Sequence, residues 1–277
     1  RFWKTGILDP ECNVQFGEGG AGTFSDGKLN TLTKDPFLRG RKVLETFAAM
    51  GAGEEILYDS KPHIGTDVLK AVLGNLRREM ERLGCEFFFH TKFTDLECAG
   101  GRLSGIFTED VRSGERRFFR TEHLILAIGH SARDTFEMLE RRRVPMEAKA
   151  FATGLRMEHP QSMINESQYG ISRPGALGAA PYKVTAKTAA GRGVYSFCMC
   201  PGGMVVNASS EERALAVNGM SYQARAGRNA NSAMVVTVGE KDFGSTDVLA
   251  GMEFQRRLER SSFLAGEGRI PVQLLKD

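Results

Sequence analysis

Residues 17–29 read GEGGAGTFSDGKL, and this stretch organises the rest of the chain. Five of its thirteen residues are glycine. Glycine loses more conformational freedom on folding than any other residue, so such a run usually allows a tight turn or a close approach of the backbone to another group. Its polar members include Thr23, Ser25, Asp26 and Lys28, beside the aromatic Phe24. The pattern favours a loop that lies against a ligand, and an ordinary glycine-rich turn is the alternative.

Two nucleotide-binding patterns match part of this stretch. Gly17, Gly19 and Gly22 satisfy the dinucleotide pattern G-x-G-x-x-G, and Gly17 with Gly22 begins a P-loop. The P-loop fails at Thr23, which stands where that pattern needs a lysine. The dinucleotide pattern fails on context, because it requires a buried strand before it and a helix after it. The preceding residues are half polar and the following ones lack a helical apolar period, so this is not the first turn of a Rossmann unit.

Composition narrows the class of protein. The 277 residues are 41% apolar and 26% charged, with a net charge of +3, which is typical of a globular protein with a sizeable core. We find no basic run interleaved with aromatic residues and no apolar stretch long enough to span a bilayer, so we expect neither nucleic acid nor membrane as a partner. Five cysteines are an odd number in a long chain and do not suggest a disulfide framework. We therefore expect a cytoplasmic location.

The first part of the chain has an α/β pattern. Helical periodicity predicts helices over 41–50, 66–83 and 131–142. Continuous apolar runs predict buried strands at 87–89 and 123–128, and looser alternation predicts a three-stranded meander over 93–98, 102–108 and 116–120. Helix, strand, meander, strand and helix in this order are typical of an α/β domain. This one has no first β–α unit of its own.

From about residue 148 the pattern changes. Short strands are predicted between clusters of Gly, Pro, Asn and Ser at 151–157, 182–188, 193–200, 204–208 and 233–238. One clear helix is predicted over 248–263. We therefore divide the chain into an α/β domain at 1–148 and a β-rich domain at 149–277.

Three stretches together resemble a known family. They are GEGGAGTFSDGKLNT at 17–31, ILAIGHSARDTFEML at 125–139, and YSFCMCPGG at 195–203 with NGMS at 218–221 and NANSA at 229–233. They resemble the NAD(FAD)-utilising, FAD-dependent dehydrogenases, which are similar in architecture to two-domain flavoproteins of the glutathione-reductase type. The resemblance implies an incomplete Rossmann-like FAD-binding domain with a β-meander, followed by a β-rich α+β substrate domain. It also implies that the true first βαβ unit lies upstream and that this chain, which begins at Arg1 without a methionine, is a central fragment.

The resemblance also implies which residues contact FAD. Residues 17–28 would pass along the flavin and its diphosphate, where glycine N–H groups are natural anion donors. The candidate residues there are Gly17, Gly19, Gly20, Gly22, Thr23, Phe24, Ser25 and Lys28. Lys92 and Phe93 resemble the strand that contacts adenine, with an ordinary meander strand as the alternative. Ala127, Gly129 and His130 resemble a second phosphate-side loop, at the carboxyl end of a strand where α/β sheets place ligands.

The candidate catalytic residues are Cys198 and Cys200. In a strand, residues two apart face the same side, so both sulfurs are predicted to point at one ligand. Beside a flavin, such a thiol pair could relay electrons or hold a thiolate charge-transfer contact. The alternative is that both cysteines simply fill a tight core. No C-x-x-C spacing suggests a metal site.

A run of polar residues follows in the second domain and could line a substrate pocket. Its members are Tyr195, Asn218, Ser221, Tyr222, Arg225, Asn229 and Asn231. The alternative is that they are turn residues, because Asn and Ser favour turns through local hydrogen bonds.

Taken together, these features predict an FAD-dependent oxidoreductase that transfers hydride to or from a small-molecule substrate. NAD(P)H is the candidate electron donor. A flavin carries its own redox chemistry, so no further catalytic triad is needed. Two alternatives stay open: a nucleotide-binding module without redox activity, and a non-catalytic scaffold that holds flavin for a partner.

Overall fold

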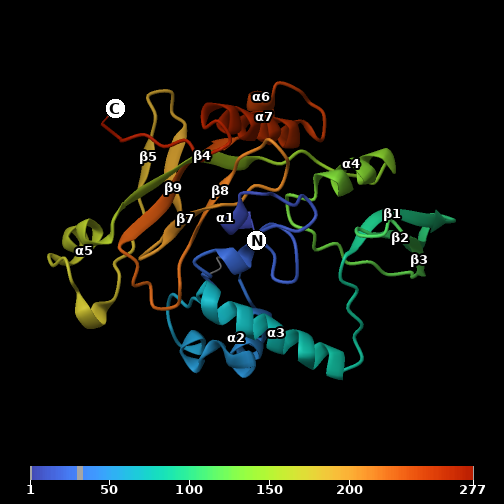
Figure 1. Cartoon of the computed structure of the whole chain (residues 1–277), viewed down its shortest axis with the longest axis horizontal. Helices are drawn as coiled ribbons and strands as arrows, with labels where there is room; N and C mark the ends of the chain where they lie inside the picture. Colours follow the sequence, from blue (N-terminus) through green and yellow to red (C-terminus); the bar gives the residue numbers. More distant parts are fainter. Residues whose placement is uncertain (1, 30–33, 277) are drawn as a thin grey trace.

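The computed structural model describes residues 2–29 and 34–276, which form helices around three antiparallel sheets (Figure 1). The helices are α1 (Phe2–Thr5), α2 (Arg39–Phe47), α3 (Thr66–Arg82), α4 (Arg133–Arg141), α5 (Gln161–Tyr169), α6 (Glu240–Phe243) and α7 (Ala250–Ala265). The strands are β1 (Thr91–Ala99), β2 (Arg102–Asp110), β3 (Arg116–Arg120), β4 (Phe151–Pro160), β5 (Thr185–Lys187), β6 (Gly193–Cys200), β7 (Met204–Asn207), β8 (Val217–Met220) and β9 (Asn229–Val238). Short helical turns lie at η1 (Ala21–Phe24), η2 (Ala48–Ala52), η3 (Glu54–Leu57) and η4 (Gly175–Leu177).

The strands pair in three separate sheets. The orders are β1-β2-β3, β4-β9-β6-β5 and β7-β8, and within the described ranges every paired strand is antiparallel to its neighbour. The expected three-stranded meander is confirmed. The first hairpin turns at Gly100 and Gly101, whose φ angles of 59° and 76° suit residues without a side chain. The fold is thus a mixed α/β arrangement.

The expected Rossmann-like parallel sheet is absent from the described part of the chain. The apolar runs at 87–89 and 123–128 form no strand, and the prediction of two buried strands is wrong. Phe88 and Phe89 are about half exposed, and Ile125 is 90% exposed. Buried parallel strands depend on neighbouring strands for hydrogen bonds and on covering helices for burial. Neither run has such a neighbour here.

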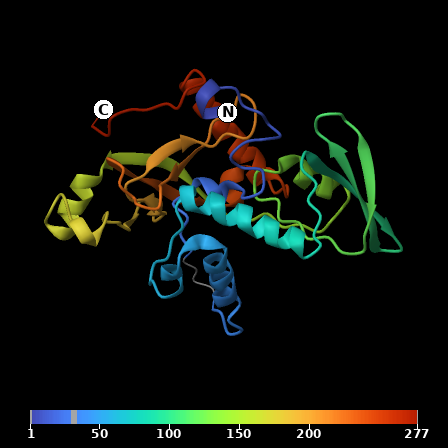
Figure 2. The same cartoon turned by 60° about the horizontal axis from the view of Figure 1, so that its bottom comes forward.

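Helix α3 packs over the first apolar core. The buried members of this core are Ala52, Ile56, Ile64 and Val72, with Leu44, Phe47, Leu69 and Leu76 packed around them. Figure 2 shows α2 and the short turns after it projecting beneath α3. Asp35 accepts hydrogen bonds from the backbone of Arg39 and Gly40 at 2.7 Å each, which satisfies free N–H groups at the start of α2. The three predicted helices in this half are therefore present, with shifted ends.

The second half is built on the four-stranded sheet. Strands β4 and β9 pair over ten positions, from Phe151 opposite Val238 to Pro160 opposite Asn229. Phe151 stacks on Phe243 and meets Phe254, which closes a second core between the sheet, α6 and α7. The sequence analysis did not predict α5 or β8.

No helix within 2–29 or 34–276 has both the length and the apolar character needed to cross a membrane.

The start of the chain lies against the second half. In Figure 1, α1 lies near the middle of the molecule, beside β7 and β8. The indole N–H of Trp3 donates to the carbonyl of Asn207 at 2.9 Å, and its ring meets Phe24 edge-on at 5.4 Å. Residues that begin the chain and residues beyond 200 therefore build one surface around the glycine-rich stretch.

Candidate functional site

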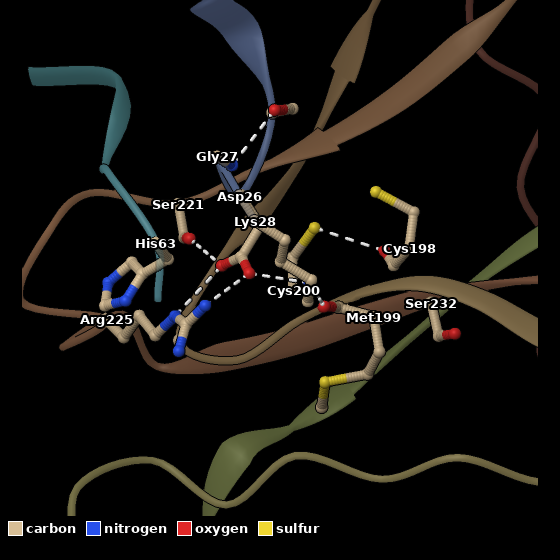
Figure 3. A network of polar contacts seen from close by, with 12 residues as sticks. Asp26, Gly27, Lys28, His63, Cys198, Met199, Cys200, Ser221, Arg225 and Ser232 are labelled. Carbon is tan, nitrogen blue, oxygen red and sulfur yellow. Dashed lines mark hydrogen bonds and ion pairs between the residues drawn. The ribbon is translucent and has the colours of Figure 1, made fainter. Parts of the chain in front are cut away.

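The glycine-rich stretch, residues 17–29, is anchored by the side chain of Asp26. This carboxylate is only 1% exposed and has three partners (Figure 3). Arg225 donates through Nε at 3.0 Å and also through Nη2, Lys28 Nζ lies 2.6 Å away, and the Ser221 hydroxyl donates a short hydrogen bond. Two of these partners come from the segment after β8. The position of the loop is therefore set by residues almost 200 positions later.

The charge of Asp26 is stabilised by these contacts. Burial alone would raise its pKa, but the hydrogen bond from Arg225 and the positive charges of Lys28 and Arg225 outweigh it. The pKa of Asp26 therefore lies below its ordinary value. A buried carboxylate with two cationic partners remains ionised at neutral pH.

Backbone contacts fix the loop further. Asn218 Nδ2 donates to the carbonyl of Phe24 at 3.1 Å, and the Thr66 hydroxyl donates to that of Ser25 at 3.2 Å. The N–H of Ile64 donates to the carbonyl of Gly27 at 2.9 Å. A Cβ on Gly27 would lie 1.8 Å from the Ile64 carbonyl oxygen, and its φ is +62°. Gly27 is therefore required by the packing of the loop on the start of α3.

The other glycines fall into two groups. A Cβ on Gly19 would lie 1.9 Å from Thr23 Oγ1 and 2.4 Å from Leu73, so Gly19 also serves packing. By contrast, a Cβ on Gly17, Gly20 or Gly22 would meet no heavy atom within 4 Å in the described part of the chain. Gly17 and Gly20 have φ of +114° and +56°, whereas Gly22 has an ordinary backbone conformation. One side of the loop is thus packed and the other is open.

Thr23 adds an unpaired polar group to this loop. Its side chain is buried, and its hydroxyl has no hydrogen-bond partner among the described residues. Buried polar groups usually have a partner, from the protein, water or a ligand. The hydroxyl faces the packed side of the loop, because it lies 1.9 Å from where a Cβ on Gly19 would stand, beside Leu73.

Three other residues of the loop make contacts within the protein. The Lys28 ammonium lies between Asp26 and the carbonyl of Met199 rather than on the open side. The Ser25 hydroxyl donates to the carbonyl of Gly22 at 2.8 Å. Phe24 packs against Trp3. These residues hold the loop in place.

The remaining candidate FAD contacts lie elsewhere. Lys92 on β1 forms ion pairs of 2.7 Å with Glu11 and Asp134, so it links the meander to the N-terminal segment and to α4. Burial would lower the pKa of Lys92, but these two carboxylates raise it above its ordinary value. Phe93 is half-buried in the same strand. Lys92 thus contacts α4, and neither residue contacts the glycine loop in any hydrogen bond or ion pair of the described residues.

The segment at 127–130 is not the end of a strand. Ala127 is exposed, and Gly129 has a φ of +68° with open space around it. His130 Nδ1 lies 2.9 Å from the Ser131 hydroxyl, and burial together with the charge of Arg133 lowers the pKa of His130. The phosphate-side loop was predicted here because a buried strand was expected at 123–128. Since no strand forms there, this reason for the candidate site no longer holds.

The two candidate cysteines lie at a β-bulge in β6. Phe197 pairs with Ala233 and Cys200 with Asn231, so β6 has one extra residue between these pairs. Cys198 adopts a φ of +46°, which is uncommon for a residue with a side chain. The alternation predicted for this strand is interrupted, because a bulge redirects side chains. Cys200 is fully buried, whereas Cys198 is partly exposed.

Positive charge surrounds this cysteine pair. Arg156 Nη1 lies 3.3 Å from the carbonyl oxygen of Cys198 and 4.0 Å from Cys200 Sγ, and it also donates to Asn231. A Cβ on Gly219 would lie 2.2 Å from Arg156 Nη1, so only glycine lets the guanidinium approach. Sequence reasoning missed Arg156, and the only signal was the glycine of NGMS.

The two thiols differ in acidity. The pKa of Cys198 is lowered to about 6, mainly by a hydrogen bond from the Cys200 thiol. Burial opposes this shift, and the positive charges of Lys28 and Arg156 add to it. The same hydrogen bond, burial and the negative charge of Cys198 raise the pKa of Cys200. Cys200 Sγ also lies 3.3 Å from the Cys198 carbonyl oxygen, which is the alternative acceptor for its single S–H proton. Cys198 is therefore the more acidic of the two thiols.

A cavity of about 810 Å³ lies between the N-terminal segment and the β7–β8 hairpin, and its lining residue Trp3 also contacts Phe24 of the glycine loop. Its wall is mostly apolar, with Trp3, Leu215, Met220 and Tyr222 among the lining residues and Glu212 and Arg213 among the polar ones. This volume is within the usual range for small-molecule sites. Of the polar run expected to line a pocket, Tyr222 is in this wall, while Asn218, Ser221 and Arg225 hold the loop.

One observation concerns metal binding, and a second concerns the remaining residues of the polar run. Within the described residues, no group of three or more His, Cys, Asp or Glu side chains could hold a metal ion. Tyr195 lies within β6, Asn229 donates to Glu158, and Asn231 accepts from Arg156. The Asn231 Nδ2 group, beside the thiols, has no partner among those residues.

Comparison with known proteins extends this description. Residues 150–277 match the model of a family described as "FAD-dependent protein, C-terminal domain-like". The whole chain is 52% identical, over 281 residues, to an uncharacterized protein of Clostridium beijerinckii. The match covers 51% of that protein, so the chain spans about half the length of this relative. The second half of the chain is thus similar to the C-terminal domains of FAD-dependent proteins.

Proposed function

We propose that this chain is part of an FAD-dependent oxidoreductase and forms the flavin-facing loop and the substrate side of its active site. The observation that carries the proposal is the two-sided character of the glycine loop. Asp26 fixes one side to the second half, while Gly17, Gly20 and Gly22 face open space. A loop that is rigid and also uncovered is suited to hold a cofactor in one position.

The residues present fit a flavin dinucleotide. Glycines without neighbours permit close approach of backbone N–H groups to a diphosphate or a flat ring. The bound flavin would supply the hydride chemistry, and NAD(P)H is the proposed electron donor. The cavity lined by Trp3 and Tyr222 would admit the small-molecule substrate.

The exposed apolar runs support a role within a larger protein. Residues 87–89 and 123–128 have the composition of buried strands, yet Ile125 is 90% exposed. Exposed apolar runs of this kind usually mark surfaces that another segment covers. The Clostridium beijerinckii relative is about twice as long as the matched region, so it contains sequence that could provide the covering strands.

The test is the visible absorption spectrum of the purified Clostridium beijerinckii relative and of this chain after addition of FAD. We expect the relative to carry flavin and NADH or NADPH to bleach it. A folded relative without flavin that also takes up none would refute the proposal. Binding of ATP or GTP instead would favour the nucleotide-binding module, and flavin that neither pyridine nucleotide reduces would favour the scaffold.

A further inference from the structure

We infer that Cys198 and Cys200 form a redox-active dithiol that reduces disulfide substrates, with Cys198 as the attacking thiolate and Cys200 as the thiol that resolves the mixed disulfide. The exchange needs no flavin. It can therefore be tested separately from the proposed oxidoreductase function.

The first argument is the backbone at Cys198. It is one of the two residues of the β6 bulge, 198 and 199, and has a φ of +46°, where residues other than glycine are rare. A conformation of this kind costs free energy and persists where the surrounding structure enforces it, often at functional sites. A cysteine that only filled the core would need no bulge. The bulge instead leaves Cys198 partly exposed next to a fully buried Cys200.

The second argument is the charge around the sulfurs. Lys28 donates to the carbonyl of Met199, which lies between the two cysteines (Figure 3). Arg156 Nη1 is 4.0 Å from Cys200 Sγ. Asp26 is the acidic group nearby, and Lys28 and Arg225 neutralise it. Thiolates are the reactive form of cysteine, and nearby lysine or arginine stabilises them. This environment therefore suits a nucleophilic thiol.

The exchange proceeds in two balanced steps. The Cys198 thiolate attacks one sulfur of the substrate disulfide; a mixed disulfide forms, the substrate S–S bond breaks and the first substrate thiolate leaves. The departing thiolate takes up the proton of Cys200. The Cys200 thiolate then attacks Cys198 Sγ, and the second substrate thiolate leaves. The substrate disulfide is reduced by two electrons, and the two cysteines are oxidised to a disulfide.

Cys200 becomes able to attack the mixed disulfide as a thiolate only after the first step. While Cys198 is an anion, its hydrogen bond and its charge both raise the pKa of Cys200. The mixed disulfide removes this negative charge, whereas Lys28 and Arg156 remain in place. The Cys200 thiol is then easier to deprotonate. The two cysteines are thereby ordered: the accessible one reacts first and the buried one second.

The experiment uses the full chain with Cys12, Cys85 and Cys98, which are all exposed, replaced by serine. The probe is dithiobis(nitrobenzoate), a disulfide that releases a yellow thiolate. We expect each chain to release two yellow thiolates and to retain no label. After digestion, the peptide that contains residues 198–200 should have a mass lower by two hydrogens, which indicates a disulfide. Cys200→Ser should stop at one thiolate with the label retained on Cys198. Cys198→Ser should slow the reaction by at least about tenfold, because the accessible thiolate is lost.

Circular dichroism of each variant checks the fold. If Cys200→Ser does not fold, the inference is decided by the number of thiolates that the chain with both cysteines releases and by the mass of its 198–200 peptide. Retained label, or release of fewer than two thiolates with no disulfide in that peptide, would overturn the inference.

Discussion

Asp26 and Arg225 lie 199 positions apart and form an ion pair in which the carboxylate is almost fully buried. This contact joins the glycine loop near the start of the chain to the segment that follows β8. Asp26 also pairs with Lys28, whose ammonium donates to the carbonyl of Met199. The contacts of one carboxylate thus link the proposed cofactor loop to the cysteine pair.

Replacement of Asp26 by asparagine should destabilise the fold. Removal of one partner from a buried ion pair usually costs about 3–5 kcal/mol. We expect the lower end of that range, about 3 kcal/mol, because Arg225 and Lys28 are both partly exposed. The measurement is urea unfolding. Asp95→Asn, which removes the exposed partner of Arg142, is the control and should shift the midpoint much less.

The contribution of Asp26 should depend on pH. Its pKa is lower in the folded state, so its stabilising effect is present above the unfolded value of about 3.9 and is lost as pH falls through the folded value. The gap in unfolding free energy between the wild type and Asp26→Asn should therefore narrow below about pH 4. A gap that stays constant from about pH 6 to pH 3 would show that the charge of Asp26 does not matter.

Two isoleucines should respond differently to the same change. Ile56 is 1% exposed in the first core, and Ile125 is 90% exposed in the apolar run. Ile56→Ala should cost about 2–5 kcal/mol, since buried methyl groups and their packing are lost. Ile125→Ala should change stability by no more than about 0.5 kcal/mol. Equal losses in urea unfolding would mean that the run at 123–128 is buried in this chain after all.

The acidity of Cys198 gives a separate test. In the chain with only Cys198 and Cys200, alkylation by iodoacetamide should show a midpoint near pH 6, because the thiolate is the reacting form. Cys200→Ala should raise that midpoint most, since the Cys200 hydrogen bond is the largest cause of the shift. Lys28→Gln should raise it less. A midpoint near the ordinary thiol value of about 8.5 in the parent chain would contradict the assignment.

Much of the local structure could be predicted from the sequence. Helices α3, α4 and α7 have clear apolar periods, and glycine turns separate the strands of the meander. The apolar run containing Ile125 was misread because a buried strand requires neighbouring strands, which no local pattern reveals. Helix α5 was missed because its residues are mostly polar and it directly follows Pro160.

The site was harder to predict, because its contacts are distant in sequence. Nothing local to Asp26 indicates that Arg225 is its partner. The alternation rule placed Cys198 and Cys200 on one side of a strand, but the bulge at Cys198 changes that relation. The roles of individual glycines also required coordinates: Gly19 is packed against Leu73, whereas Gly22 in the same pattern is open.

The central claim is that the open side of the glycine loop holds FAD. Gly22→Ala tests it cleanly, because Gly22 has an ordinary φ and a Cβ there meets no neighbour among the described residues. Gly193→Ala is the matched control, since Gly193 is equally open and lies at the start of β6. Both changes should leave the unfolding midpoint nearly unchanged.

The decisive measurement is flavin content of a hybrid in which this chain replaces the matching 281 residues of the Clostridium beijerinckii relative. We predict that the hybrid and its Gly193→Ala variant purify with FAD. Gly22→Ala should weaken FAD binding by at least about tenfold, because the added methyl group occupies the space of the cofactor. A folded hybrid without flavin, or a Gly22→Ala hybrid that binds FAD as tightly as the parent, would contradict the account.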